Sequence, residues 1–264
     1  MKNILVPIGS SENSINTLQY AIDFAKEVDA NVFVLRAYNV QSKAGTIIDV
    51  NAILERESNL YMRSMINSVD RKGKDVQLIS AKGNVVDSIA AIHKEIGIDI
   101  VMMGPKSNSI KEEVFLGTTS GSVVKKSNIP VLVVPESYVF KPFSSVLTAF
   151  KSGIVKDENA LNPLKFIKNQ FNPVINLLLV KTPGHVDADL VVDTSLESVK
   201  SSLTITENAT TFQGVLEHFQ SHNPDMLCVF RRKRGFFNKL WEKNTILKKE
   251  FHCSIPLLVL SGKA

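Results

Sequence analysis

The sequence lacks any hydrophobic run long enough to cross a membrane. Its apolar stretches fall well short of the roughly 18 residues of a transmembrane helix, and the opening Met1-Lys-Asn-Ile-Leu-Val-Pro7 reads as a strand and not as a secretion signal. We therefore expect neither a membrane span nor a signal peptide, and we expect a cytoplasmic protein.

Cysteine is also scarce, with two residues in 264. Cys228 and Cys253 lie in or beside apolar segments without C-x-x-C spacing, so we expect packed, reduced thiols and no zinc site built on them. Neither a G-x-S-x-G elbow nor a Walker loop G-x-x-x-x-G-K-[S/T] occurs. These absences favour a protein that is not an enzyme.

Neither positive nor negative charge is in large excess. The net charge of +5 is modest for 264 residues, and 44% hydrophobic with 22% charged residues is ordinary for a globular protein. Nucleic acid is therefore an unlikely partner for the chain as a whole.

Apolar strands alternate with amphipathic helices in the first half of the chain. We expect strands at Asn3–Ile8, Asn31–Ala37, Asp75–Ala81, Asp99–Met103 and Ile129–Val134, with helices near 15–25, 48–72 and 85–96 and after Gly117. This rhythm favours an α/β fold with a parallel sheet of order 3-2-1-4-5 and helices on both faces. Ligands of such sheets bind where the winding reverses, here beyond Ile8 and Met103.

The rhythm then repeats. Asp99–Gly104 aligns with Asp225–Phe230, and Ile129–Val134 aligns with Ile255–Leu260, both at an offset of 126 residues. We predict two domains, 1–137 and 138–264. The second is expected to hold strands at Ser144–Phe150, Val174–Val180 and Ser202–Thr206 and helices at Asp157–Phe171, Leu190–Lys200 and Thr210–His222.

A loop motif lies between the fourth and fifth strands. Gly104, two residues, Ser107, nine residues and Gly117-Thr118 resemble the nucleotide loop G-x2-G-x9-G-[S/T] of the universal stress protein family, and the flanking strands are similar too. A Gly-Thr-Thr-Ser run that opens a helix also suits phosphate, because it offers backbone N–H groups, hydroxyls and a positive helix end. The resemblance implies two tandem Rossmann-like domains of the adenine nucleotide alpha hydrolase-like type.

The resemblance also implies a site for ATP or AMP in the first domain, with no metal beyond nucleotide-bound Mg²⁺. The base would lie near Ile8, Gly9 and Ala37, and the ribose near Pro7 and Gly104. The residues implied are Pro7, Ile8, Gly9, Ala37, Met103, Gly104, Lys106, Ser107, Gly117, Thr118, Thr119 and Ser120.

Two positions depart from the family pattern. Gly9 stands where binders have Asp, and Ser107 stands where they have Gly. Loss of a charge-assisted hydrogen bond costs about 1.5–3 kcal/mol, and a positive φ at Ser107 would cost about 1–2 kcal/mol. Together they could turn a micromolar site into a millimolar one. A vestigial pocket is therefore the rival interpretation.

The second copy of the loop has lost its small residues. Phe230, Lys233, Lys243 and Asn244 replace Gly104, Ser107, Gly117 and Thr118, so we predict no nucleotide there. The segment Arg231–Trp241 is basic and aromatic instead. It is either a docking surface for an acidic partner, an anionic lipid or nucleic acid, or a helix with its apolar residues in the core and its lysines in solvent. The second interpretation is preferred, because one short basic cluster falls short of a nucleic-acid footprint.

The closing strand of each domain begins with Ile-Pro, which favours a sheet edge. Because the family is known to associate through this strand, we predict that the two pair within the chain as a pseudo-dimer. Two domains on a flexible linker are the alternative. Whether two chains also pair as a homodimer is left open.

The preferred function is a non-enzymatic stress-response protein whose first domain binds ATP or AMP as a sensor. The alternatives are a nucleotide-independent scaffold that uses Arg231–Trp241, and a slow ATPase. His218 and His222 have a metal-binding spacing, but no third ligand is evident, so a solvated helix face is preferred.

Overall fold

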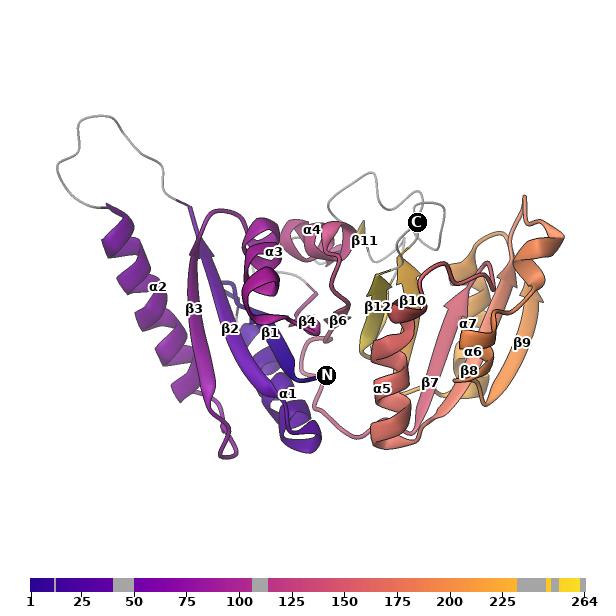
Figure 1. Ribbon diagram of the computed structural model, residues 1–264, viewed down its shortest axis with the longest axis horizontal. Helices are drawn as coiled ribbons and strands as arrows, with labels where there is room; N and C mark the ends of the chain where they lie inside the picture. The colour runs from indigo at the N-terminus through magenta and orange to yellow at the C-terminus, as the bar shows by residue number, and fades with distance from the viewer. Residues whose placement is uncertain (12, 40–49, 106–113, 232–245, 248–251, 262–264) are drawn as a thin grey trace.

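The structure is a computed structural model that describes residues 1–11, 13–39, 50–105, 114–231, 246–247 and 252–261 (Figure 1). The strands of the first half are β1 (Asn3–Pro7), β2 (Asn31–Tyr38), β3 (Val76–Lys82), β4 (Ile100–Met103), β5 (Val114–Leu116) and β6 (Val131–Val133). Those of the second half are β7 (Ser145–Phe150), β8 (Val174–Lys181), β9 (Ser202–Glu207), β10 (Met226–Arg231), β11 (Ile246–Leu247) and β12 (Leu257–Ser261).

Ten of these strands form one sheet of order β3-β2-β1-β4-β6-β12-β10-β7-β8-β9. Each half therefore has the predicted order 3-2-1-4-5, and the two halves follow this order in opposite directions along the sheet. All pairs within a half are parallel. The predicted α/β fold is confirmed in both halves.

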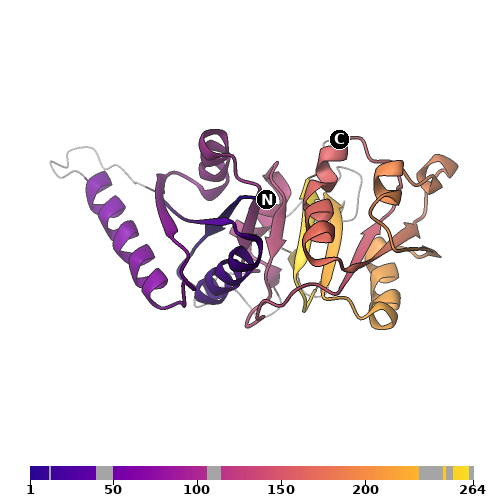
Figure 2. The same ribbon diagram turned by 60° about the horizontal axis from the view of Figure 1, so that its bottom comes forward.

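The halves meet where β6 and β12 pair in antiparallel register. Val131, Leu132 and Val133 lie opposite Val259, Leu258 and Leu257. Figure 2 shows the halves side by side, with the magenta and pink strands of the first against the yellow strand of the second. The predicted intrachain pairing is therefore present, and two domains joined only by a flexible linker are not what the structure contains. A second contact, the two-stranded sheet of β5 and β11, was not predicted.

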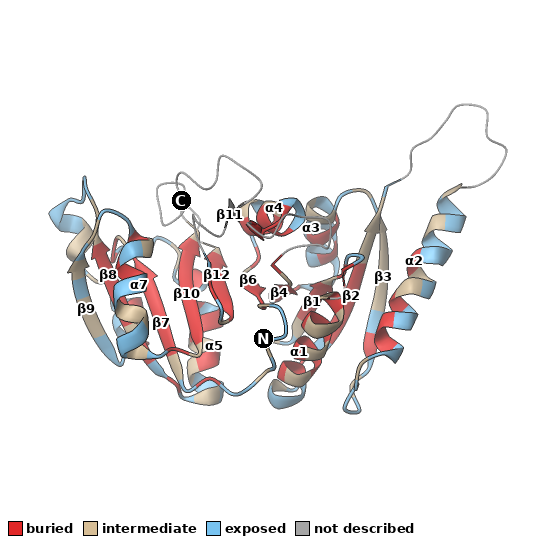
Figure 3. Ribbon diagram, turned by 180° about the vertical axis from the view of Figure 1, so that it is seen from behind, coloured by how far each residue is buried: buried red, intermediate tan, exposed pale blue. Residues whose placement is uncertain are grey.

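Helices cover both faces of the sheet, as expected for a doubly wound fold. They are α1 (Asn13–Val28), α2 (Val50–Asn67), α3 (Val85–Ile96), α4 (Thr118–Lys126), α5 (Asn162–Phe171), α6 (Thr194–Glu197) and α7 (Thr211–His222), with the 3-10 turns η1 (Glu158–Leu161) and η2 (Asp187–Leu190). One core cluster includes α1, α2 and α5, and the other includes α3, α4 and α7. Figure 3 shows the buried residues concentrated on the central strands. No described helix combines the length and the apolarity that a bilayer span requires.

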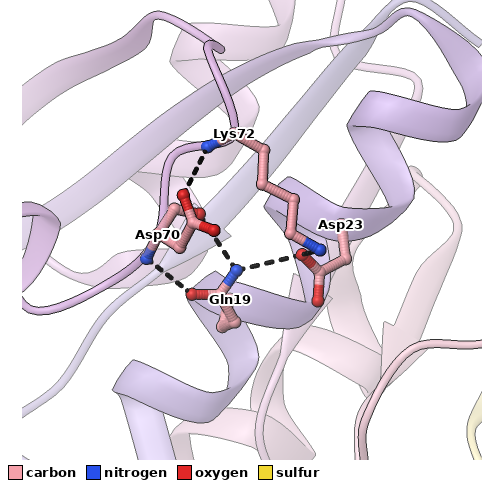
Figure 4. Close-up of polar contacts among 4 residues, drawn as sticks. All are labelled: Gln19, Asp23, Asp70 and Lys72. Atoms are coloured by element: carbon pink, nitrogen blue, oxygen red, sulfur yellow. Dashed lines mark hydrogen bonds and ion pairs between the residues drawn. The ribbon is translucent and has the colours of Figure 1, made fainter.

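Three predicted helices are shorter than expected. The helix expected to reach residue 72 ends at Asn67, and the chain then reverses with positive φ at Lys72 and Gly73. Gln19 holds this reversal by bonding both backbone groups of Asp70, and Lys72 pairs with Asp23 at 2.8 Å (Figure 4). The helix expected at 190–200 is instead η2 followed by α6. The helix expected at 157–171 is divided into η1 and α5.

Aromatic rings pack beside the segment that joins the halves. Phe140 stands edge-on to Tyr20 and Phe24 of α1, with ring centroids 5.3 and 5.6 Å apart. Phe171 of α5 packs against Phe24, Phe140 and Phe143. The linker is thus anchored to both halves, which is consistent with their fixed relation through β6 and β12.

Candidate functional site

The winding of the first half reverses between β1 and β4, and the predicted crevice lies at this point. Pro7 ends β1, opposite Leu35 of β2, and the Ile8 N–H donates to the Leu35 carbonyl at 2.9 Å. Met103 ends β4, the other neighbour of β1. The predicted residues therefore lie together at the carboxyl ends of neighbouring parallel strands. They are Pro7, Ile8, Gly9, Ala37, Met103 and Gly104.

The N-terminus of α4 also lies at the carboxyl ends of these strands. Gly117 is its N-cap and has no side chain to bond the N–H groups of the first turn. The Gly117 N–H itself donates to the Pro105 carbonyl at 3.0 Å, which closes the base of the loop. Thr118 and Thr119 follow as exposed hydroxyl residues. This helix end can accept anionic oxygens.

Ser120 has a different role from the one implied by the family motif. Its hydroxyl donates to the Gly104 carbonyl at 2.9 Å, and its side chain is buried. The hydroxyl therefore ties α4 to the end of β4 and does not face a ligand. Lys106 and Ser107, which complete the motif, lie outside the described residues.

An open groove of about 360 Å³ runs between α3 and α4, next to the carboxyl end of β2. Its lining residues are Ala37, Asn39, Gly83, Asn84, Val85, Val86, Thr118, Thr119, Ser122 and Lys126. Three of these, Ala37, Thr118 and Thr119, were predicted from the sequence. The groove is open to solvent and combines apolar side chains with hydroxyl and amide groups and one cation.

The remaining groove residues were missed by sequence reasoning. Thr118, Ser122 and Lys126 are spaced four apart, so they share one side of α4. Gly83 has a φ of +118°, which only glycine adopts readily, and Asn84 caps α3 by accepting the Asp87 N–H at 3.0 Å. The Gly-Asn pair before a helix and the four-residue spacing were the signals available.

One side of Gly104 is closely covered by α1. A Cβ built there would lie 2.3 Å from Asn13 Nδ2 and 3.2 Å from Thr17 Oγ1, because α1 packs closely on the end of β4. The side of Gly104 on which a side chain would lie is therefore taken by α1, and a ligand that approaches the backbone at this point would have to come from another side. Both polar atoms of the Asn13 amide are buried, without a hydrogen-bond partner in the described part of the chain.

Gly9 is open, in contrast. A Cβ at this position would meet no atom within 4 Å. Its carbonyl accepts the Tyr61 hydroxyl at 2.9 Å, and the Tyr61 ring stacks under the Arg36 guanidinium at 3.7 Å. A Cβ at position 9 would therefore lie in open space.

The matching crevice of the second half is closed. Phe230, which replaces Gly104, is buried and stands edge-on to Phe150 with ring centroids 6.4 Å apart. The segment that includes η2 crosses the end of β7, where the Gly153 N–H donates to the Asp189 carbonyl at 2.8 Å. Bulky rings and main chain thus fill the space that a ligand would need. Lys233, Lys243 and Asn244 lie outside the described residues.

The remaining candidates from the sequence are a pair of histidines and two cysteines. His222 Nδ1 lies 2.9 Å from the His218 carbonyl, and the described residues contain no group of three metal-ligating side chains. Cys228 and Cys253 are buried free thiols, as predicted, and burial raises the pKa of each to about 12. Both thiols are therefore protonated and unreactive near neutral pH.

Of the basic segment predicted at Arg231–Trp241, Arg231 lies within the described residues. Its guanidinium is partly buried against the first half and bonds the Lys125 carbonyl at 2.7 Å. Burial lowers the pKa of this guanidinium. Residues 232–241 lie outside the described ranges.

The first half of the chain matches known proteins. The model of the universal stress protein family matches residues 1–135. The universal stress protein MJ0531 of Methanocaldococcus jannaschii is 24% identical over 138 residues, which cover 50% of this chain and 81% of that protein. MJ0577 of the same organism is 33% identical over 81 residues, 31% of this chain and 50% of that protein.

One solved structure is similar over nearly the whole length. A universal stress protein from Archaeoglobus fulgidus covers 98% of this chain and 96% of its own, with 21% identity and a TM-score of 0.70. At this identity the likeness establishes the shared two-domain fold. It says nothing by itself about a ligand.

Proposed function

The chain belongs to the universal stress protein family, and on that premise we propose that its first half is a non-catalytic module that binds ATP or AMP. The observation that carries the proposal is the groove of about 360 Å³ beside the uncapped N-terminus of α4. Its volume falls in the range of about 300–1,000 Å³ that is common for small-ligand sites.

The chemistry of the groove suits a nucleotide laid along it. Phosphate oxygens would accept hydrogen bonds from the N–H groups of the first turn of α4 and from the hydroxyls of Thr118 and Thr119. Lys126 contributes a positive charge further along the same side of α4. Ala37, Val85 and Val86 offer an apolar wall of the kind that a base covers.

The affinity should be weak compared with relatives that keep the aspartate. Gly9 supplies no carboxylate, and a charge-assisted hydrogen bond is worth about 1.5–3 kcal/mol. We therefore place binding between the high micromolar and millimolar ranges. Such a site would respond to large changes in nucleotide concentration, which fits a sensor that reports to a partner.

One nucleotide per chain is proposed, since Phe230 and Phe150 occupy the second crevice. Each nucleotide would carry any Mg²⁺ it needs, because the described residues offer no metal cluster of their own. The cytoplasm is the proposed location. Two buried free cysteines are usual for a reducing compartment.

A nucleotide-independent scaffold is the second candidate. It is favoured by the Asn13 amide, which occupies the space that Gly104 would otherwise leave open for a ligand. In that case the first crevice is vestigial and the function rests on contacts with an unknown protein partner.

Isothermal titration with ATP, AMP and GTP separates these candidates. We expect one ATP or AMP per chain and weaker binding of GTP. Thr119→Glu places a carboxylate in the groove and should abolish the heat by repelling phosphate. Gln213→Glu adds the same charge at the start of α7 and should leave binding unchanged. Absence of heat at millimolar nucleotide with the unaltered chain would favour the scaffold.

A further inference from the structure

Arg231 reaches from the second half of the chain into the first. It ends β10, and its side chain bonds two groups at the far end of α4. Nη1 donates to the Lys125 carbonyl at 2.7 Å, and Nη2 donates to Asn128 Oδ1 at 3.3 Å. These residues are more than 100 positions away in sequence, so the contact is a tertiary link between the halves.

The contact is favourable for the helix it touches. The last carbonyls of an α-helix are unpaired and carry the negative end of the helix dipole. A guanidinium that donates to one of them forms a charge-assisted hydrogen bond, which is stronger than a neutral one. A second donor to Asn128, just beyond the helix, fixes the direction of the guanidinium plane.

The second half also holds the chain where α4 begins. Ile246 and Leu247 of β11 pair with Leu116 and Val114 of β5, and Leu116 directly precedes the N-cap Gly117. Figure 1 shows β11 beside α4 at the junction of the halves. Both ends of α4 are therefore held by the same half of the chain, which has lost its own crevice.

The length of α4 makes this double contact relevant to the groove. At 1.5 Å per residue its nine residues span only about 14 Å. A helix this short moves as one piece, so a shift at Lys125 is transmitted to the N–H groups at Thr118 and Thr119. The second half is placed to set the orientation of the phosphate-binding end.

We infer that Arg231 is a positioning residue for the nucleotide groove of the first half, holding α4 so that its N-terminus faces the ligand. The inference rests on the proposed function for its effect on affinity. It assigns a task to the second half, which keeps the fold without a ligand site of its own. It also explains why the first basic residue of the segment 231–234 turns inward.

Hydrogen–deuterium exchange of the full chain without nucleotide tests the positioning directly. Arg231→Gln cannot span the same distance with two donors, so exchange of the peptide covering 117–126 should rise roughly fivefold or more. Arg231→Lys keeps the charge and one donor and should give a smaller increase. Lys168→Gln is the matched control, because Lys168 Nζ donates to the Ser198 carbonyl at 2.8 Å within the second half. Unchanged exchange in Arg231→Gln, or an equal rise in Lys168→Gln, would overturn the inference.

Titration with ATP then tests the link to affinity. The dissociation constant should rise about fivefold or more in Arg231→Gln and stay the same in Lys168→Gln. Equal affinity in Arg231→Gln despite faster exchange would contradict the inference that Arg231 sets the affinity of the groove. If the unaltered chain gives no heat, the proposed function fails, and the exchange experiment alone decides whether Arg231 positions α4.

Discussion

Asp99 and Asp225 occupy equivalent places in the two halves. The Asp99 carboxylate accepts the backbone N–H groups of Lys2 and Asn3 at 2.6 and 2.9 Å. The Asp225 carboxylate accepts those of Ser144 and Ser145 at 2.8 and 3.1 Å. Each aspartate thus ties the turn before the fourth strand of its half to the start of the first strand. The repeat seen in the sequence extends to individual hydrogen bonds.

Asp225 should make folding sensitive to acid. Burial raises the pKa of this carboxyl group, but hydrogen bonds from Lys141, Ser144 and Ser145 outweigh burial and hold its pKa below the usual value. Stability from a carboxyl group with a lowered pKa is complete above about pH 4 and is lost as pH falls through the folded-state pKa. Asp225→Asn should therefore lower the free energy of unfolding by about 1 kcal/mol at pH 7.

Urea denaturation at pH 7 and pH 3 measures this effect. The difference between the unaltered chain and Asp225→Asn should shrink at the lower pH. Asp75→Asn alters an exposed aspartate and serves as the control. A difference that stays constant over this range would show that the charge of Asp225 is not what stabilises the fold.

Gly104 should be intolerant of any side chain. A methyl group there would lie 2.3 Å from Asn13 Nδ2, so Gly104→Ala should lower the free energy of unfolding by about 1–3 kcal/mol. In an Asn13→Ala background the loss should be smaller, because the clashing amide is gone. A double-mutant cycle by chemical denaturation gives the coupling between the two sites. Equal losses in both backgrounds would contradict the packing described at this position.

Gly9→Asp should improve nucleotide binding. The space at Gly9 is open, so the carboxylate enters without a clash, and it restores the group that related binders use. A new charge-assisted hydrogen bond of about 1.5–3 kcal/mol corresponds to roughly tenfold or more in affinity. Calorimetric titration with ATP gives the change, and Gly9→Ala fills the same space without the charge. If both variants bind ATP equally, the missing carboxylate is not the cause of weak affinity.

Phe230 should be structural and unrelated to any ligand. Truncating this buried ring leaves a cavity beside Phe150, so Phe230→Ala should lower the free energy of unfolding by about 3–5 kcal/mol. The number of nucleotides bound per chain should stay at one. Appearance of a second equivalent in calorimetry would mean that the second crevice is a site merely blocked by this ring.

Periodicity predicted the strands, because buried parallel strands appear as uninterrupted apolar runs. The pairing of β6 with β12 was predicted from two arguments together. An Ile-Pro pair comes just before each of these short strands, which marks them as edges, and the family that the chain resembles associates through this strand. The end of α2 did not follow from local pattern. Gln19 and Asp23 hold the turn at Asp70 and Lys72, and α1 contributes those two side chains from about 50 residues away.

The candidate site was predicted less completely than the fold. The motif identified the N-terminus of α4 and the ends of β1, β2 and β4. It did not reveal that Ser120 bonds the Gly104 carbonyl or that Asn13 covers Gly104, because both depend on how α1 and α4 pack against β4. The inward turn of Arg231 was equally hidden, since its partner carbonyl belongs to the other half.

Amide chemical shifts recorded during an ATP titration test the central claim most directly. If the groove of the first half binds the nucleotide, shifts should concentrate at Ala37, Asn84 and residues 118–119 and saturate with one ATP per chain, while Phe150 and Phe230 stay unchanged. No shifts at millimolar ATP, or shifts confined to the second half, would contradict the account.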